Sequence, residues 1–489
     1  MIPTRSRSLA DPDPAAGIRF VTLAHDLHAR DEGLAGAADD PEGLVVLGPG
    51  QAVLSPDFNI QVLAAAAERP DVALFYGDDA VVGEPSPRLH LKPAFNRALL
   101  HAQDYIGPLV VIRAGALRRL GGLQPQMATA ALYDLVLRAD GEGLPIEAIR
   151  SVLAVYRGER PACSPADRRT ALMQACAQDG GPTMLLPGLT PQSLRLRRRF
   201  VVHPEVTLLI PTRQAAAEGG EAHIARLLDS LAASSWPSDR LRVLIGDDVE
   251  PGEIYGDLRR YPFLVERLIT GRPPQAPFNY AAKMNRLWRA ARTEHLVMLN
   301  DDVRVVAPDW LEGLMSFAVD REVGGVGARL LYPDGSVQHA GMVGGPFGVF
   351  IHPWIGQPGD QPTYGDWALV QRDWSAVTGA VFATRRSALE AVNGFDERFA
   401  LEYNDVDLCL RLKLAGYRIV QAPDALLIHH EKASRGETAA PGSQTALFLR
   451  RWGQVIANDP AYHPGLRRDG FVVQPAPTGG AWYTQISVG

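Results

Sequence analysis

The stretch EHLVMLNDDVRVVAPDW, residues 294–310, contains a short apolar run that ends in an amide and two carboxylates. The run His295–Leu299 has the length and apolar content of a strand buried on both faces. Asn300, Asp301 and Asp302 follow it directly. Ligands of open parallel sheets bind beyond the carboxyl ends of the strands, so this order of residues predicts a ligand site.

Similar runs precede this stretch. Val206–Ile210 and Leu241–Ile245 are separated by a predicted helix over His223–Ser234, and a second predicted helix covers Ala281–Ala291. Short apolar runs separated by helices predict a mostly parallel sheet that is covered on both faces, so the fold class is α/β. The second run leads into Asp247, which places a further carboxylate at the same edge of the sheet.

An earlier part of the chain repeats this pattern. EGLVVLGPGQAVLSPDF, residues 42–58, aligns with residues 294–310 without a gap. Residues 106–123 then align with 378–395, and residues 133–138 align with 406–411. Three matches in the same order predict a tandem duplication. The alternative is that two unrelated α/β segments share one strand–turn–helix pattern.

The two copies differ in their polar residues. The residues that replace Asn300, Asp301, Asp302 and Asp405 in the first copy are Gly48, Pro49, Gly50 and Leu132. Asp407 and Arg411 persist as Asp134 and Arg138, so we assign this pair to structure rather than to chemistry. The first copy is also too short at its amino end for a full strand–helix–strand opening. We therefore predict a degenerate, truncated first copy and an intact second copy.

The chain has 489 residues, which suggests two to four domains at about 100–200 residues each. We expect a disordered tail over 1–17, a degenerate domain over 18–157, a connector over 158–203 and a catalytic domain with a carboxyl-terminal extension over 204–489. The connector contains a predicted helix near 166–178. Its arginines from 195 to 199 indicate a solvated strand face, or else a surface for an acidic partner or lipid headgroups.

Composition excludes several classes of protein. Lys and Arg total 49 against 55 Asp and Glu, so no basic excess is present to neutralise nucleic acid phosphates. The three cysteines are far apart, without zinc-type spacing, which is typical of a reducing compartment. The sequence contains neither an apolar run of about 18 residues nor a signal-peptide pattern near its start. We expect a cytoplasmic protein without a transmembrane segment.

The second copy closely resembles the family 2 glycosyltransferases, which have the GT-A fold. Eight segments carry the resemblance in the family's order over about 260 residues: VTLLIPTR (206–213), VLIGDD (243–248), FNYAAKMN (278–285), MLNDDV (298–303), AVTGAVFATRR (376–386), NGFDERFALEYNDVDLCLRLKLAGYRI (393–419), HHEKASRG (429–436) and RWGQVIANDPAYHPGL (451–466). The last resembles the tail of bacterial members that build rhamnose-containing or O-antigen polysaccharides. YGDDA, residues 76–80, resembles an acidic turn of the family in the first copy.

The resemblance implies a divalent metal, Mn²⁺ or Mg²⁺, that neutralises the diphosphate of a nucleotide sugar. It assigns Asp302 as the carboxylate ligand, with Asn300 assisting, at the family's Asp-x-Asp position. His429 is the implied imidazole ligand, and His430 is its rival. The alternatives are a solvated turn for the aspartates and a packed or surface histidine for His429.

The resemblance also implies a general base, Asp405. Leu408, Leu412 and Ala415 repeat at helical spacing, which places Asp405 in the first turn of a helix with Asn404 as its N-cap. A helix N-terminus favours the ionised carboxylate that a base needs. The alternative is that Asp405 serves in capping alone.

Further residues are implied for the nucleotide sugar. They are Pro211, Thr212, Arg213, Asp247, Asn285, Asp301 and Gly379. Asp247 would accept from N3–H of uracil or thymine, with a helix cap as the alternative, and Asn285 has a helix-surface role as its alternative. We also consider an acceptor platform of His339, His352, Trp354 and Trp374, although core packing explains each tryptophan equally well.

Two functions follow from these assignments. The first is a metal-dependent inverting glycosyltransferase that moves a hexosyl or rhamnosyl group from a UDP- or dTDP-sugar to a saccharide or lipid-linked acceptor, in cell-surface polysaccharide synthesis. Peripheral association with the inner face of the membrane fits that role. The second is a non-catalytic protein that binds polysaccharide or nucleotide on the same scaffold. Asp302, Asp405 and His429 favour the enzyme.

Overall fold

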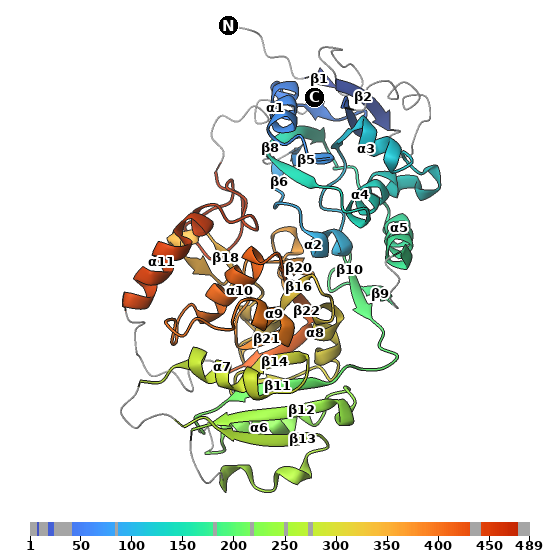
Figure 1. Cartoon of the computed structure of the whole chain (residues 1–489). Coiled ribbons are helices and arrows are strands. Elements are labelled where there is room, and N and C mark those ends of the chain that lie inside the picture. The colour runs from blue at the N-terminus through green and yellow to red at the C-terminus, as the bar shows by residue number, and fades with distance from the viewer. Residues whose placement is uncertain are drawn as a thin grey trace.

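The structure is a computed structural model. It describes residues 7–8, 18–23, 42–83, 87–178, 183–215, 220–248, 253–271, 277–430 and 442–477. The predicted disordered tail lies outside the described residues except for Arg7–Ser8, and so does the serine end of the HHEKASRG segment. The chain forms a first unit (residues 18–157) and a second unit (204–477), which meet along α2 (Arg97–Ala102) and β10 (Leu194–Arg198) (Figure 1).

The second unit is built on a long mixed sheet, in the order β13–β12–β11–β14–β21–β16–β22–β15. Its strands are β11 (Val206–Pro211), β12 (Leu241–Asp247), β13 (Leu264–Ile269), β14 (His295–Leu299), β15 (Val303–Val305), β16 (Val323–Leu331), β21 (Val381–Arg385) and β22 (Arg418–His429). Strands β13, β12, β11 and β14 are parallel, whereas β21 runs antiparallel between β14 and β16. The predicted α/β fold class is confirmed, and the predicted parallel pairing holds from β13 to β14, whereas the rest of the sheet is mixed.

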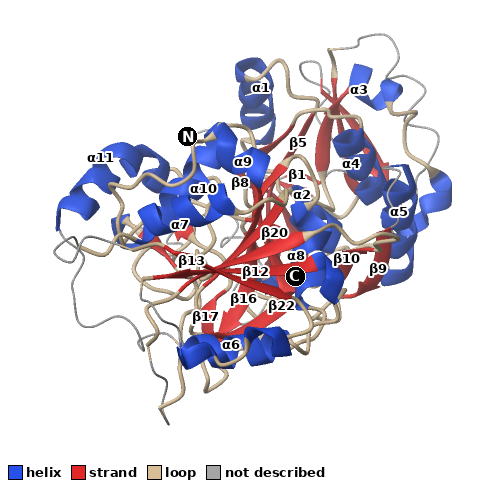
Figure 2. Cartoon of the chain, turned by 60° about the horizontal axis from the view of Figure 1, so that its bottom comes forward, coloured by secondary structure: helices blue, strands red, loops and turns tan. Residues whose placement is uncertain are grey.

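Helices cover both faces of this sheet (Figure 2). They are α6 (His223–Leu231), α7 (Tyr280–Ala290), α8 (Trp310–Ala318), α9 (Arg386–Ala391), α10 (Asn404–Leu414) and α11 (Gly442–Ala457). Along β11, Leu208 and Ile210 pack with α6 and α8, while Leu209 packs with α7 on the opposite face. This alternation explains why the strand sequences are continuously apolar.

The first unit has a smaller sheet with the order β4–β8–β5–β7–β3–β2 at its core. These strands are β2 (Ile18–Leu23), β3 (Leu44–Pro49), β4 (Val53–Leu54), β5 (Leu74–Val82), β7 (Val110–Arg113) and β8 (Ile146–Arg157). The same order and orientations recur in the second unit as β15–β22–β16–β21–β14–β11. In the described part of the first unit, β12 and β13 have no counterpart.

Helices α1 (Phe58–Glu68), α3 (Ala114–Arg119) and α4 (Ala131–Gly141) complete the first unit. In α4, Arg138 pairs with Asp134 at 2.7 Å, and in α10 Arg411 pairs with Asp407 at 2.7 Å. Each arginine also donates to a main-chain carbonyl at the end of a preceding helix, namely that of Leu120 or Val392. The Asp–Arg pair therefore makes the same structural contacts in both units.

The connector contains α5 (Pro165–Gln178), as predicted, and a hairpin of β9 (Thr183–Pro187) and β10 (Leu194–Arg198). The interpretation of its arginines as a solvated face is wrong for Arg197. That side chain is buried and pairs with Asp424 and with Asp309, the latter at 3.0 Å. Buried guanidinium groups require such partners, so these ion pairs hold β10 against the second unit.

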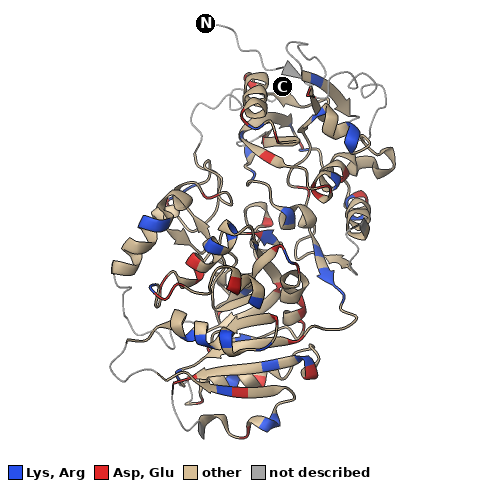
Figure 3. Cartoon of the chain, in the orientation of Figure 1, with Lys and Arg blue, Asp and Glu red and all other residues tan. Residues whose placement is uncertain are grey.

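Elsewhere, acidic and basic residues are interspersed over both units (Figure 3).

The two units share one buried cluster. α2 (Arg97–Ala102) packs beside β20 (Arg372–Asp373), and Asn96 donates to the carbonyl of Asp373 at 2.7 Å. Apolar residues of the segment 337–380, which we call the wall segment, belong to the same core as α2 and α4. The buried ones are Val337, Ala340, Val343, Ile351, Trp354, Trp367, Ala368, Val370 and Trp374. The first unit therefore completes the core behind the wall segment.

A buried cation lies at this junction. Arg372 is fully buried, with its guanidinium carbon 3.8 Å from the ring centroid of Trp367 and 4.1 Å from that of Trp374. Its Nη2 donates to the carbonyl of Ala461 at 2.5 Å. Burial lowers the pKa of Arg372 to about 9.

Within the described ranges, none of the helices is both long and apolar enough to cross a membrane.

We expect residues 200–489, expressed alone, to aggregate or to unfold at a lower temperature than the full chain. Removal of the first unit uncovers part of the shared cluster, and each large apolar side chain exposed forfeits about 1.5–3 kcal/mol. Thermal unfolding and size-exclusion chromatography of the fragment and the full chain measure this. A monomeric fragment with the melting temperature of the full chain would show that the first unit is an independent module.

Candidate active site

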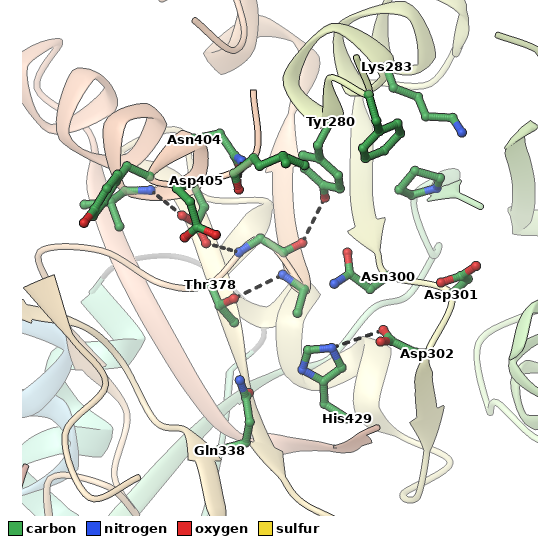
Figure 4. A pocket seen from close by; sticks show the side chains of 18 of the residues that line it. Tyr280, Lys283, Asn300, Asp301, Asp302, Gln338, Thr378, Asn404, Asp405 and His429 are labelled. Atoms are coloured by element: carbon green, nitrogen blue, oxygen red, sulfur yellow. Dashed lines mark hydrogen bonds and ion pairs between the residues drawn. The ribbon is translucent and has the colours of Figure 1, made fainter. Parts of the chain in front are cut away.

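A cavity of about 670 Å³ opens at the carboxyl ends of β11 and β14. It is lined by all the predicted site residues except Asp247 and Asn285. Those that line it are Pro211, Thr212, Arg213, Asn300, Asp301, Asp302, Gly379, Asp405 and His429. In Figure 4, Asn300, Asp302 and His429 lie on one side of the cavity and Asp405 on the other. Residues more than a hundred positions apart are thus brought to one site.

Asp302 and His429 face each other because their strands pair. Antiparallel pairing of β15 with β22 sets Val303 opposite His429. His429 Nε2 lies 3.1 Å from Asp302 Oδ1, and its Nδ1 is buried with no hydrogen-bond partner in the described structure. Successive strand residues point to opposite sides, so His430 lines a separate hollow beside His223. His429, rather than His430, therefore belongs to the cavity.

The two carboxylates after β14 have different environments. Burial raises the pKa of Asp301, and the hydrogen bond from Thr212 Oγ1, at 2.6 Å, offsets only part of this effect. Burial also acts to raise the pKa of Asp302, but the hydrogen bond and charge of His429 outweigh it, so that pKa lies below its ordinary value. Asp302 is consequently the carboxylate that stays ionised most readily.

Asp405 lies in the first turn of α10 and points into the cavity. Its Oδ2 accepts from the N–H of Gly379 at 2.9 Å. A β-carbon at Gly379 would lie 3.3 Å from that of Asp405, so a glycine allows this close approach. The predicted N-cap is off by one residue, because Tyr403 caps the helix and Asn404 donates instead to the carbonyl of Leu401.

Asp407 lies two residues after Asp405 in α10 and is fully buried. It accepts from Arg411 at 2.7 Å, from Arg451 at 2.6 Å and from the indole N–H of Trp452 at 3.0 Å. Every partner is a structural neighbour, and Asp407 does not line the cavity.

Asp247 is fully buried at the end of β12 and lies outside the cavity lining. Its Oδ2 accepts from Tyr255 Oη at 2.6 Å and from Gln214 Nε2 and Arg267 Nη2, each at 2.9 Å. In this structure three protein groups bind its Oδ2, and contact of Asp247 with a nucleobase stays a prediction.

The predicted contact of Asn285 with the nucleotide is wrong in this structure. Its amide nitrogen donates to the carbonyl of Phe395 and to Glu397, and its oxygen accepts from Trp288 and from the N–H of Phe395, all at 2.9 Å. These four bonds use the whole capacity of the amide. Asn285 braces α7 against the 395–397 loop.

For Trp354 and Trp374, core packing is the alternative that the structure bears out. Trp354 and Trp374 are core residues that contact each other edge to face, and His339 is fully buried. Of the four residues, only His352 lines the cavity.

The sequence analysis did not single out several residues of the cavity. Lys283 is buried with its Nζ 2.7 Å from the carbonyl oxygen of Thr212 and 3.0 Å from Asp248 Oδ1. Arg213 lies over the ring of Phe278. Both Phe278 and Lys283 belong to the quoted segment FNYAAKMN, so the signal was present, although no individual role was drawn from it.

Comparison with known proteins agrees with this arrangement. The family model described as glycosyltransferase like family 2 matches residues 203–451, which span the second unit from before β11 into α11. The chain belongs to glycosyltransferase family 2. The family's GT-A fold is the fold of the second unit.

Three relatives show how the chain compares with longer and shorter proteins. The uncharacterized protein y4gI of Sinorhizobium fredii is 32% identical over 86% of this chain and 48% of its own length. The O-antigen biosynthesis protein RfbC of Myxococcus xanthus is 32% identical over 92% of this chain and 36% of its own length. An N-acetylglucosaminyl-diphospho-decaprenol L-rhamnosyltransferase of Mycobacterium tuberculosis is 30% identical over 46% of this chain and 80% of its own length.

The chain thus spans about half, or less, of the length of the first two relatives. Those two matches cover both units of this chain.

We predict that Asp407→Asn destabilises the glycosyltransferase fold by an amount on the order of 3 kcal/mol. The change leaves Arg411 and Arg451 without their buried carboxylate. Urea denaturation followed by circular dichroism measures the difference. Asp405→Asn is the matched control, two positions away, and should change stability far less. Equal stability of the two variants would contradict the structural role of Asp407.

Proposed function

We propose that the chain is a metal-dependent, inverting glycosyltransferase. It transfers a sugar from a UDP- or dTDP-linked donor to a saccharide or lipid-linked saccharide in cell-surface polysaccharide synthesis. The observation that carries the proposal is one cavity with a carboxylate–imidazole pair on one side and Asp405 on the other. The names of RfbC and of the L-rhamnosyltransferase favour an O-antigen type polysaccharide and a rhamnosyl or hexosyl donor.

The residues at the end of β14 suit a divalent cation. The described residues contain no group of three or more His, Cys, Asp or Glu side chains placed to hold a metal. Asp302, His429 and the amide of Asn300 nevertheless offer three donors in one cavity, and the diphosphate of a donor supplies further oxygens. An imidazole ligand favours Mn²⁺ over Mg²⁺. When bound, the metal neutralises charge on the leaving diphosphate.

Asp405 is suited to take the proton of the acceptor hydroxyl. Its Oδ2 accepts from the Gly379 N–H, and its place in the first turn of α10 directs the carboxylate into the cavity. In a single displacement the acceptor oxygen forms its bond to the anomeric carbon, the bond to the diphosphate breaks, and the hydroxyl proton passes to Asp405. Attack from the side opposite the leaving group inverts the configuration.

On the donor side, Pro211, Thr212 and Arg213 form the wall that follows β11. Lys283 places a cation beside this wall, where the diphosphate of a donor would lie. Asp301 supports the wall by accepting from Thr212. These contacts support a diphosphate subsite without a role for Asp247 in base recognition.

We assign no transfer activity to the first unit. Gly48, Pro49 and Gly50 provide no side-chain oxygen for a metal, and Leu132 cannot accept a proton. Its strands persist because they support the core behind the wall segment. We place the enzyme in the cytoplasm, in agreement with three cysteines that form no disulfide, and allow peripheral contact with the membrane where a lipid-linked acceptor is used.

We expect Asp302→Ala to abolish metal-dependent turnover, because the variant loses the charged ligand beside His429. The measurement is release of UDP or dTDP from a panel of nucleotide sugars, with Mn²⁺ and with excess EDTA. Asp301→Asn is the control, since Asp301 is bound by Thr212 and should be less sensitive. Full turnover of the wild-type chain in EDTA would refute the metal requirement.

We expect Asp405→Asn to slow the chemical step by about 10²–10⁴-fold, the range typical of a lost general base. The amide is isosteric with the carboxylate, so nucleotide binding should survive. Rapid-quench kinetics with the active donor and calorimetric titration with UDP or dTDP separate the two effects. Near-normal turnover of this variant would favour the alternative function, a protein that binds nucleotide or polysaccharide without transfer.

A further inference from the structure

Tyr403 is an unusual residue for the position that it occupies. It is the N-cap of α10, two residues before Asp405, and its φ of 61° lies in the left-handed region. Glycine and asparagine adopt this region most readily, and Ser, Thr, Asp and Asn are the preferred N-caps. The tyrosine side chain makes no capping hydrogen bond. Neither local preference explains a tyrosine here, and residues that break such preferences concentrate at functional sites.

Aromatic stacking fixes the ring of Tyr403. The ring lies nearly parallel to that of Phe448 in α11, with the centroids 4.3 Å apart and an interplanar angle of 12°. Phe448 is fully buried and also meets Phe350 and Phe399 edge to face, with centroids 6.1 Å apart in each pair. The stack therefore holds the Tyr403 ring in one place, although its backbone conformation is unfavourable.

This ring belongs to the wall of the cavity. Tyr403 and Phe350 both line it, whereas Phe448 lies behind them. In the part of the chain that the structure describes, no residue forms a hydrogen bond with the Tyr403 hydroxyl, and this oxygen is not sealed from solvent. Tyr403 therefore has both an aromatic ring and a hydroxyl available to a bound molecule.

The position of Asp405 indicates which molecule that is. A general base must lie within hydrogen-bond reach of the hydroxyl that it deprotonates, so the acceptor sugar lies against Asp405. The charged and polar groups that suit the donor diphosphate, among them Lys283 and Asn300, lie across the cavity from Asp405 (Figure 4). Sugars present apolar C–H faces that pack on aromatic rings, and hydroxyls that form hydrogen bonds with a phenol.

We propose that Tyr403 is a specificity-determining residue that binds the acceptor saccharide beside the base. The proposal rests on the proposed glycosyltransferase function and assigns a residue to its acceptor side. The stack on Phe448 positions the ring, and the left-handed turn at Tyr403 leads directly into α10, so that Tyr403 and Asp405 both line the cavity.

Two substitutions separate binding of the acceptor from support of the fold. Tyr403→Asn removes the ring and the hydroxyl, but asparagine readily adopts the left-handed backbone, so the start of α10 should persist. Tyr403→Phe keeps the ring and its stack and removes the hydroxyl alone. Phe347→Asn is the matched control, because Phe347 is also an aromatic residue with a positive φ, of 53°, and lies outside the cavity lining.

Steady-state kinetics of the full chain measure donor and acceptor separately. The probes are a panel of nucleotide sugars as donors, with methyl glycosides and prenyl-diphosphate-linked sugars as acceptors. We expect Tyr403→Asn to raise KM for the acceptor about 10- to 100-fold, and Tyr403→Phe to raise it about 3- to 10-fold, as for a lost hydrogen bond. KM for the donor, and the rate of donor hydrolysis with water in place of the acceptor, should be unchanged. Phe347→Asn should match the wild-type chain in every constant.

The outcomes separate the role of Tyr403 from the proposed function. A wild-type KM for the acceptor in Tyr403→Asn refutes the role of Tyr403 and leaves the proposed function intact. A fall in donor hydrolysis as large as the fall in transfer also refutes it, because Tyr403 would then only support Asp405. A normal KM in Tyr403→Phe together with a raised KM in Tyr403→Asn assigns the contact to the ring. A wild-type chain that transfers sugar from none of the donors refutes the proposed function, and the role of Tyr403 falls with it.

Discussion

The guanidinium of Arg372 is fully buried, so the protein rather than water must stabilise its charge. Two indole rings cover its faces, and a carbonyl from residue 461 accepts one of its hydrogens. The indoles belong to the wall segment and the carbonyl to the carboxyl-terminal segment, while α2 of the first unit packs beside the same strand. A cation in this position is tolerable only when all three parts are in place. The wall segment therefore folds stably around Arg372 only together with the carboxyl-terminal segment and α2.

The geometry of the active site depends on this junction. Asp459 holds the wall segment from behind, since it accepts from the N–H of Gly344 at 2.6 Å and from the hydroxyl of Ser375. Three residues after Ser375, the same stretch of wall presents Thr378 and Gly379 to the cavity. The position of the amide that holds Asp405 is thus determined by contacts on the far side of the wall. The first unit contributes to this geometry through its part of the shared core.

Periodicity and motif order in the sequence were sufficient to predict the sheet, its covered faces and most of the cavity. Strand ends are local features, so Asn300, Asp301 and Asp302 could be placed from the run His295–Leu299 alone. The predictions that failed concern side chains whose partners are distant and lie in irregular segments. Asn285 is bound by residues more than a hundred positions away, and Arg197 by Asp424. No local pattern indicates such partners, nor that Trp354 and Trp374 would enclose a buried cation rather than face the cavity.

His429 and His430 are adjacent, yet the pairing of Val303 with His429 turns one toward Asp302 and the other toward His223. A strand has a two-residue period, so the insertion or deletion of a single residue ahead of this pair would exchange the two imidazoles. The two histidines are chemically identical, and only their count along the strand distinguishes them. Sequence drift in this region is therefore constrained in length more strictly than in composition: the site could accept new neighbours for His429 more easily than one additional residue before it.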